Sequence, residues 1–485
     1  MNKSANNEKQ SLTSRRAFIK QASIGLAGFM ILPRHVLGGR GFVAPSDRLY
    51  IAGIGVGGMG FQDLKRISED KRVVVAHLCD VDERRSKDAR SLFEGAAFHK
   101  DWRRMMDTVS SDIDAVTIST PDHNHAVPAL RAMQGGKHVY VQKPLTKDIY
   151  EARVLTEAAQ KYNVVTQMGN QGASGDGVRR LQEWYDAGVI GEVDTVYCWT
   201  DRPVWPQGQA WPSGKFEVPK ALDWDLWLGT APYKDYVDGL VPFNWRGWWD
   251  YGTGALGDMG CHLIEAPFTV LGLDRVDRVE ASVGSVYVDE FKRGYHPEAF
   301  PPSSHVTMRV SRKGDSDKPV TVHWMDGGIR PSRPEELLPS ETFGDGGNGV
   351  LFEGSKGKMM CGTYGERPQL LPTSKVDNTP ETMARVKDGA QGHYLQWVEA
   401  CMAGEADYLS ASFDKAGPLT ELLLIANLAI KGHDVRLSQQ NGKGYVYPAR
   451  DITLEWSHSD MKVTNLDEVN AFVKRTYREG FELII

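Results

Sequence analysis

Cysteine is scarce in this sequence, and its spacing excludes the common uses of cysteine clusters. The chain has 5 cysteines among 485 residues, and they are far apart, odd in number and never arranged as a C-x-x-C pair. Neither a disulfide framework nor a zinc site is therefore indicated, and no metal site is expected. We expect small buried residues at Cys79, Cys198, Cys261, Cys361 and Cys401.

An excess of positive charge is also missing. The sequence has 57 Lys and Arg against 63 Asp and Glu, a formal net charge of -6, and it contains no long basic run. Nucleic acid and an anionic membrane surface are therefore not expected as partners. The length and a hydrophobic content of 41% allow more than one core, so we expect two domains.

The apolar stretch from Ala22 to Leu32 is well short of the about 20 residues that a membrane-spanning helix needs. It follows SRRAFIK (Ser14 to Lys20), which resembles the twin-arginine export signal S/T-R-R-x-F-L-K, with Ile19 as the one departure. We therefore expect residues 1–46 to be a signal and linker, a periplasmic location, and no integral membrane segment after signal removal. The alternative is a chance Arg-Arg pair beside an amphipathic helix. The twin-arginine route carries folded proteins, so a cofactor loaded before export would have to stay bound.

A glycine-rich loop follows the first strand candidate. Arg48 to Ile54 is apolar and leads into the pattern Gly53-x-Gly55-x-x-Gly58, with Gly60 beyond it and a helical stretch after the loop. Glycines so spaced allow a tight turn, close approach of the backbone to a pyrophosphate, and close packing of helix and strand. The helix N-terminus would then face the phosphates. We therefore predict a dinucleotide site at Gly53, Gly55 and Gly58.

The second strand candidate, RVVVAHLCD, ends in Asp80. A carboxylate at this position can bind the ribose hydroxyls, and it would repel a 2'-phosphate, which favours NAD. Arg84 and Arg85 follow closely, and a guanidinium there could accept that phosphate. NAD is the expected cofactor, and NADP stays open.

Strands and helices continue to alternate beyond this point. A helix is expected around 103–109, a strand at DAVTIST, a helix at 126–134 and a strand at HVYVQ. This order predicts a parallel, doubly wound sheet in a Rossmann domain over residues 47–167. Ligands bind at the carboxyl ends of such strands, where the sequence has TPDHNH (120–125) and QKP (142–144). The cofactor residues expected there are Thr120, Pro121, His125 and Lys143.

Together these motifs resemble the Gfo/Idh/MocA oxidoreductases. The shared features are the glycine loop, T-P-x-x-x-H, an [E]-K-P strand end and a later D-x-x-x-H, with further similarity at GVIGEV, GALGDMGCH and LTELLLIANLAIKG. The resemblance implies an α/β fold whose second domain, 168–485, carries a large open mixed sheet. We expect VHWMDGG and LFEGSKGKMM to be strands and a hairpin of that sheet. The family uses its open face for ligands or subunit pairing, and a homo-oligomer is expected. The resemblance does not reach the tail from Gly442 onward, which holds a helix candidate, NLDEVNAFVKRTYREG.

The same resemblance implies catalytic roles for Lys143, Asp258 and His262. In the family the lysine of E-K-P lies beside the nicotinamide and the substrate; here Gln142 replaces the glutamate, which would favour the neutral amine of Lys143. Asp258 and His262 are spaced to share one helix face. A histidine can accept the hydroxyl proton when a secondary alcohol gives hydride to the nicotinamide. Asp258 could orient substrate hydroxyls, hold His262, or do both. The alternative is an exposed helix pair.

Eight of the 13 tryptophans lie between Trp199 and Trp249. Pyranose rings present apolar C–H faces to indole rings and hydroxyls to charged or amide partners, so such a segment suits a sugar. The alternative is packing between loop and sheet, because tryptophan is highly buried on average. Asn170 could equally be a turn residue. The residues expected to contact substrate are Asn170, Trp245, Arg246 and Trp248.

These features predict an exported NAD(P)-dependent oxidoreductase that acts on the CH–OH group of a sugar or sugar derivative and recycles a tightly bound cofactor. One alternative is a redox-neutral glycosidase or lyase, in which transient oxidation of a ring carbon acidifies the neighbouring C–H. A further alternative is a non-catalytic sugar- or nucleotide-binding protein that has kept the fold.

Overall fold

The computed structural model describes residues 47–439, 442 and 444–485. The predicted export signal at Ser14 to Lys20, with the whole of the segment 1–46, lies outside the described residues. Among the described residues, no helix combines the length and the apolar character that are needed to cross a bilayer.

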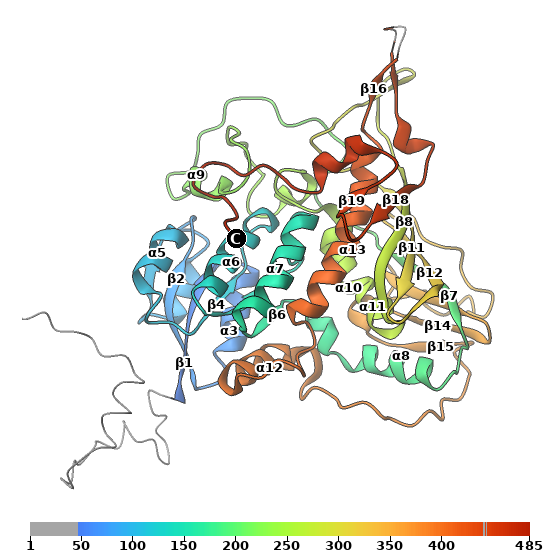
Figure 1. The fold of residues 1–485 in the computed structure, drawn as a ribbon, viewed down its shortest axis with the longest axis horizontal. Helices are drawn as coiled ribbons and strands as arrows, with labels where there is room; N and C mark the ends of the chain where they lie inside the picture. The colour runs from blue at the N-terminus through green and yellow to red at the C-terminus, as the bar shows by residue number, and fades with distance from the viewer. Residues whose placement is uncertain (1–46, 440–441, 443) are drawn as a thin grey trace, which may run out of the picture. The chain divides into compact units, whose positions relative to one another are not determined.

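The first sheet is parallel and comes from the early part of the chain. Its strands are β1 (Leu49–Ile54), β2 (Val73–Cys79), β3 (Ala97–His99), β4 (Ala115–Ile118), β5 (His138–Val141) and β6 (Thr166–Met168). Their order is β3-β2-β1-β4-β5-β6 (Figure 1), which confirms the predicted doubly wound sheet. The winding changes direction between β1 and β4, and such a switch opens a binding crevice at the carboxyl ends of the strands.

Helices cover both faces of this sheet, which is why its strands read as continuous apolar runs. The helices are α3 (Met59–Ile67), α4 (Lys87–Leu92), α5 (Trp102–Val109), α6 (Ala126–Gln134), α7 (Ile149–Tyr162) and, from much later in the chain, α12 (Gly389–Ala403). Trp397 of α12 is buried in one cluster with Leu49 and Ile51 of β1. A segment distant in sequence therefore completes the packing of the first sheet.

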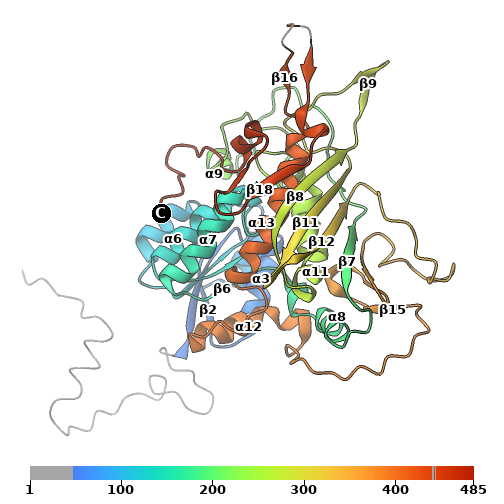
Figure 2. The ribbon, with the colours of Figure 1, turned by 45° about the vertical axis from the view of Figure 1, so that its right-hand side comes forward.

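The second sheet is mixed, as predicted. Its strands are β7 (Val193–Trp199), β8 (Leu273–Val283), β11 (Ser304–Arg312), β12 (Asp315–Met325), β13 (Gly349–Gly354), β14 (Gly357–Cys361), β15 (Gln369–Leu371), β18 (Leu454–Ser457) and β19 (Lys462–Val463). They lie in the order β15-β14-β13-β7-β12-β11-β8-β18-β19 (Figure 2). β7 and β12 are parallel, whereas β13 and β14 form an antiparallel hairpin. Two small ribbons lie outside this sheet: β9 (Tyr287–Asp289) with β10 (Lys292–Arg293), and β16 (Leu437–Ser438) with β17 (Tyr445–Val446).

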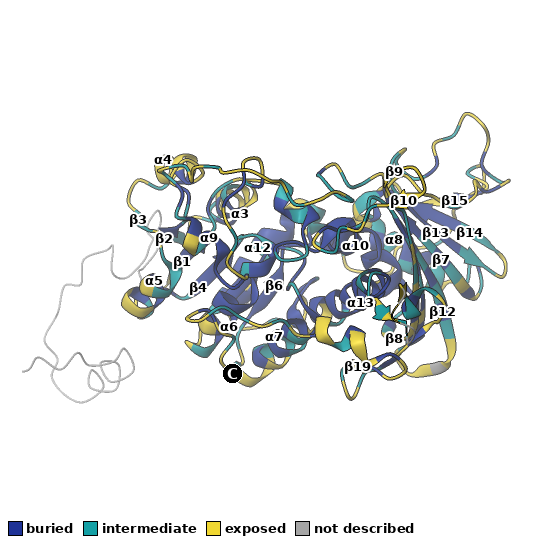
Figure 3. Ribbon diagram, turned by 90° about the horizontal axis from the view of Figure 1, so that it is seen from above, coloured by how far each residue is buried: buried dark blue, intermediate teal, exposed yellow. Residues whose placement is uncertain are grey.

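The second sheet packs its helices on one face. These helices are α8 (Asp176–Asp186), α10 (Gly254–Leu263), α11 (Glu265–Val270) and α13 (Phe413–Gly432), whereas the short α9 (Trp224–Leu228) packs within the tryptophan-rich segment. α13 contacts α7, α10 and β8, and Figure 3 shows buried residues concentrated in α10 and α13, between the two sheets. On β8, Leu273, Val276 and Val279 are buried while the positions between them are mostly exposed, so its other face is open.

The tail from Gly442 onward corrects one prediction. The helix expected over NLDEVNAFVKRTYREG is only a 3-10 helix at Asp467–Phe472, and the chain after it is irregular. Tertiary contacts override helix propensity here: Asn470 binds the backbone of the β19 strand through its side chain, and Arg475 forms an ion pair with Glu151 of α7 at 2.5 Å. The tail thus returns to the first domain.

Candidate active site

In the structure, the glycines that fulfil the roles of the G-x-G-x-x-G pattern lie two residues later in the chain than predicted from the sequence. Gly53 is inside β1, where a Cβ would meet the side chain of Leu64 at 2.9 Å. Gly55 makes the turn with φ of +75°, a conformation that favours glycine. A Cβ at Gly60 would lie 1.9 Å from the carbonyl oxygen of Gly55, so this residue allows helix and loop to pack closely. The pattern G-x-G-x-x-G therefore falls on Gly55, Gly57 and Gly60.

Asp80 follows β2 and is half-buried beside the glycine loop. Its carboxylate accepts hydrogen bonds from the backbone N–H groups of Val56 and Asp82, both at 2.9 Å. Burial raises the pKa of Asp80 to about 6, against the effect of these bonds. The carboxylate is at the position from which a ribose is bound in a Rossmann fold.

The two arginines after Asp80 have different surroundings. Arg84 is paired with Asp82 at 2.6 Å. Arg85 instead lies over the glycine loop, because a Cβ at Gly58, which has φ of +58°, would be 2.6 Å from its Nη2 atom. Of the two, only Arg85 is placed to meet a phosphate at this loop.

A cavity of about 400 Å³ joins the glycine loop to the segment that contains Trp245. The predicted site residues that line it are Gly55, Gly58, Asp80, Thr120, Pro121, Lys143, Trp245 and Arg246. Its features fit a nicotinamide dinucleotide: glycines where side chains would clash, the N-terminus of α3 without a side-chain cap, and a carboxylate for the ribose. The predicted residues that do not line it are Gly53, His125, Asn170, Trp248, Asp258 and His262.

His125 holds the loop together and does not line the cofactor cavity. It is 1% exposed, and its ring nitrogens lie 2.8 Å from the carbonyl oxygens of Thr120 and Pro144. The histidine of T-P-x-x-x-H thus ties the end of β4 to the K-P turn after β5. These contacts hold the segments that carry Thr120 and Lys143, and a direct role of His125 in cofactor binding stays a prediction.

Asp258 forms an ion-pair cluster with two residues that line the cavity. The Nζ atom of Lys143 is 2.8 Å from Asp258 Oδ1, and the Nε atom of Arg246 is 3.2 Å from the same oxygen. Burial opposes ionisation, but the charges of Lys143 and Arg246 hold the pKa of Asp258 well below its usual range. These residues come from three separate segments and meet at one carboxylate.

His262 is bound by Asn170 rather than by Asp258. The Nδ1 atom of His262 is 3.0 Å from Asn170 Oδ1, and the Asn170 amide donates to Cys261 O at 2.8 Å and to Glu265 Oε2 at 3.2 Å. These two donations fix the amide orientation, so the Asn170 oxygen accepts from His262 Nδ1–H and the Nε2 atom is the unprotonated nitrogen. Burial, with the charge of Lys143 added, holds the pKa of His262 well below its usual range, so the ring is neutral.

Tyr364 is a site residue that the sequence does not reveal. Its ring lies edge-on to His262, with the two centroids 4.5 Å apart, and it comes from the turn between β14 and β15. Its φ of +63° is uncommon for a bulky residue and carries strain of the kind found at functional sites.

Two buried acids next to the site were also missed. Asp63 of α3 accepts hydrogen bonds from Gln142 Nε2, 3.0 Å from each carboxyl oxygen, and from Ser119 at 2.7 Å. Burial raises its pKa to about 7. Asp122 lines the cavity and accepts a hydrogen bond from Thr253 at 2.6 Å. Asp122 belongs to the TPDHNH motif and could have been proposed from it, whereas nothing in the sequence marks Asp63.

The tryptophan-rich segment is mostly core. Trp248 is 3% exposed and packs edge-on against Trp211 with centroids 4.7 Å apart, so the structure shows a packing role and its contact with substrate stays a prediction. Trp245 does line the cavity, and the guanidinium of Arg246 lies 4.3 Å from its ring centroid. Trp227 is a further cavity residue. Among the described residues, no group of three or more His, Cys, Asp or Glu side chains is arranged to hold a metal ion.

Comparison with known protein families gives matches for two parts of the chain, both within residues 49–299. Residues 49–170 match the Gfo/Idh/MocA model described as an oxidoreductase family with an NAD-binding Rossmann fold. Residues 192–299 match the model described as the C-terminal alpha/beta domain of the oxidoreductase family.

Two curated relatives match part of the chain. Levoglucosan dehydrogenase of Pseudarthrobacter phenanthrenivorans is 26% identical over 173 residues, which cover 36% of this chain and 36% of that protein. A glycosyl hydrolase family 109 protein of Shewanella pealeana is 27% identical over 169 residues, covering 30% of this chain and 37% of the relative. The chain therefore spans little more than a third of these relatives.

A solved structure of levoglucosan dehydrogenase in complex with NADH extends the likeness over both domains. It matches with a TM-score of 0.53 and 17% identity, over 80% of this chain and 98% of that one. At this identity the match shows the fold alone.

Proposed function

Because the chain is a Gfo/Idh/MocA family oxidoreductase, with the NAD-binding Rossmann domain and the C-terminal α/β domain of that family, we propose that it transfers hydride between a nicotinamide dinucleotide and a hydroxyl-bearing carbon of a sugar or sugar derivative. The observation that carries this proposal is the ion pair between Lys143, which lines the cavity, and Asp258. The cavity-lining Trp245 and Arg246, and the sugar dehydrogenase among the relatives, support a carbohydrate substrate. Asp80 favours NAD over NADP.

Each side chain of the site has its own role in the proposed hydride transfer. A bound nicotinamide would supply the hydride acceptor or donor. As the ammonium partner of an ion pair, Lys143 can donate a hydrogen bond to the oxygen of the reacting carbon and stabilise charge that develops there. His262, neutral and with Nε2 unprotonated, is the group suited to take the hydroxyl proton. Asp258 keeps Lys143 in place, and Asn170 sets the tautomer of His262.

Replacing Lys143 by methionine tests this assignment. We expect nucleotide binding to persist and hydride transfer to a panel of sugars to fall about 100-fold or more. His262→Asn should give a loss of similar size. Lys65→Met, at an exposed position of α3, is the matched control. Unchanged turnover in both Lys143→Met and His262→Asn would contradict the proposal and favour a non-catalytic binding protein.

We also propose that the protein is exported with its nucleotide bound and that each turnover restores the redox state of that nucleotide. The resemblance of SRRAFIK to a twin-arginine signal supports this proposal. The test is to purify the exported protein, denature it without added nucleotide, and identify what is released. Stoichiometric NAD or NADP is expected, and exported protein without nucleotide would contradict the recycling model. Export should also stop when Arg15 and Arg16 are both changed to lysine.

A redox-neutral glycosidase is the second candidate, because a glycosyl hydrolase family 109 protein is among the relatives. In that reaction the hydride returns to the carbon from which it came, so no second sugar is needed. Release of free sugar from a glycoside without an added acceptor would favour this candidate. Turnover that depends on an added acceptor would favour the oxidoreductase.

A further inference from the structure

A second cavity, of about 250 Å³, shares no lining residue with the cofactor cavity. Five segments form it: the start of α7 with the two residues before it, the loop from Trp249 to Thr253, Phe300, one face of α13, and the tail. The side chains that matter for its chemistry are Lys147, Trp249, Asn427, Lys431, Phe472 and Arg475.

Two lysines that line this cavity form no ion pair with a carboxylate of the described residues. Among the described residues, no carboxylate lies within ion-pair distance of Lys147 or Lys431; Lys431 instead donates to the carbonyl oxygen of Pro297. Burial lowers the pKa of Lys431 to about 8 and also lowers that of Lys147. Placing two ammonium groups in such surroundings is costly unless an anion accompanies them.

Two buried polar atoms in the same cavity have no hydrogen-bond partner within the described part of the chain, Asn427 Oδ1 and Arg475 Nη1. Asn427 is only 4% exposed, and its amide nitrogen is already used by the carbonyl of Thr253. The other nitrogens of Arg475 bind Glu151 and the carbonyl of His123. Because buried polar atoms are nearly always paired, the cavity offers an acceptor for a hydroxyl and a donor for an oxyanion.

The carboxylates that face the cavity are already engaged. Asp148 caps α7 and lies 3.6 Å from Arg475, and burial raises its pKa to about 7. Asp250 is paired with Lys234 at 2.7 Å. Neither forms an ion pair with either of the two lysines, although both lie near enough to favour the charged lysines.

Aromatic rings complete the wall. Trp249 stacks on Phe300 with centroids 3.5 Å apart, and the ammonium of Lys431 lies 5.0 Å from the Trp249 ring and 5.4 Å from the Phe472 ring. An indole face beside cations and an amide oxygen suits a ring that carries both C–H groups and polar substituents.

We propose that this cavity is a second ligand site, which binds a small polyhydroxylated molecule through an oxyanion, the carboxylate of a sugar acid or the phosphate of a sugar phosphate. The oxyanion would lie among Lys147, Lys431 and Arg475, and a hydroxyl would donate to Asn427. The site is independent of the hydride-transfer proposal, although Thr253 on its wall donates to Asp122 of the cofactor cavity.

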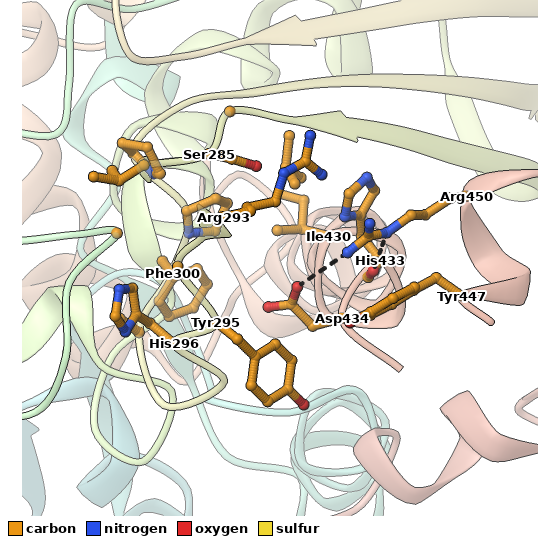
Figure 4. A pocket seen from close by; sticks show the side chains of 18 residues that line it. Ser285, Arg293, Tyr295, His296, Phe300, Ile430, His433, Asp434, Tyr447 and Arg450 are labelled. Carbon is orange, nitrogen blue, oxygen red and sulfur yellow. Dashed lines mark hydrogen bonds and ion pairs between the residues drawn. The ribbon is translucent and has the colours of Figure 1, made fainter. Parts of the chain in front are cut away.

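A neighbouring cavity of about 100 Å³ at the end of α13 shares Phe300 with it (Figure 4). There His433 Nδ1 is also unpartnered among the described atoms. Arg450, however, binds the carbonyl of His433 and lies 3.9 Å from Asp434. Its positive charge is therefore partly compensated, and the proposal rests on the larger cavity alone.

The test is calorimetric titration of the full-length, nucleotide-loaded protein with D-glucuronate and with glucose 6-phosphate, at up to about 10 mM. Glucose is the neutral ligand control. We expect at least one of the two anions to bind once per chain, at least tenfold more tightly than glucose, and the preferred anion identifies the source of the oxyanion.

Variants locate the binding. Lys431→Met and Asn427→Leu should each weaken it tenfold or more, whereas Lys474→Met, at an exposed position of the same tail, should leave it unchanged. Unaltered nucleotide content shows that each variant is folded. The proposal is overturned if neither anion binds, or if folded Lys431→Met and Asn427→Leu bind like the parent protein.

Discussion

The raised pKa of the buried Asp63 carboxyl group predicts how the stability of the protein changes with pH. Asp63 has no exposed surface, and within the described part of the chain its polar contacts are the donors Gln142, Ser119 and Tyr394. Burial disfavours the charged carboxylate more than these donors favour it, so its pKa is raised to about 7 from 3.8. Asp63→Asn keeps the shape of the side chain and removes the titration.

Proton linkage gives the direction in which the stability of the folded protein changes with pH. Between the unfolded pKa and the folded pKa, the folded protein holds a proton at Asp63 that the unfolded chain has lost, so stability falls as pH rises through this window. The shift of about three units corresponds to about 4 kcal/mol over the whole window, and to about 3 kcal/mol between about pH 5 and pH 8. Asp63→Asn does not titrate and should avoid that loss.

Scanning calorimetry of both proteins across this pH range measures the effect. For a chain of this size about 1 kcal/mol corresponds to about 1 °C in Tm, so the Tm of Asp63→Asn relative to the parent should rise by about 3 °C from about pH 5 to about pH 8. Asp88→Asn, at an exposed position of α4, should show no such trend. A difference that is independent of pH would refute the reasoning and would mean that the donors keep Asp63 ionised.

Three further predictions concern the site and the tail. Asn170→Leu should free the tautomer of His262 and lower kcat about 100-fold with little change in nucleotide binding, measured by steady-state kinetics. Gly60→Ala, whose Cβ would lie 1.9 Å from a backbone oxygen, should abolish nucleotide binding or folding, read by the nucleotide released on denaturation. Arg475→Met should leave the fully buried Glu151 without its cation and cost about 3–5 kcal/mol, seen as a lower Tm; an unchanged Tm would contradict this.

The fold was predictable because its signals are local and periodic. The runs LYIAGI and AVTI, separated by helices, specify buried parallel strands, and the hairpin at 349–361 also follows from a local pattern. The packing of Trp397 of α12 against β1 was not predictable, because it joins segments from opposite parts of the chain. The helix predicted in the tail is absent for the same reason: Arg475 forms an ion pair with Glu151, a contact between distant segments that local helix propensity cannot predict.

The candidate site shows the same division. The sequence gives Lys143, Asp258 and His262 through motifs, but the partners of these side chains lie far away in sequence. The spacing of Asp258 and His262 on one helix face suggests that they contact each other, whereas the structure pairs Asp258 with Lys143 and His262 with Asn170. Two residues on one helix face point to the same side of the helix, but their hydrogen-bond partners come from the other elements that pack against that face.

The departure from the family's E-K-P motif at Gln142 now has a physical account. Its amide nitrogen lies 3.0 Å from both oxygens of Asp63, so a glutamate at this position would bring two carboxyl groups together without water, and one of them would have to stay protonated. An amide supplies the donor that a buried carboxyl group needs. Lys143, the next residue, has its ammonium on Asp258 instead, so Gln142 and Lys143 serve different partners. The glutamine is therefore matched to the aspartate on α3, and the ion pair that carries the proposed chemistry is made without it.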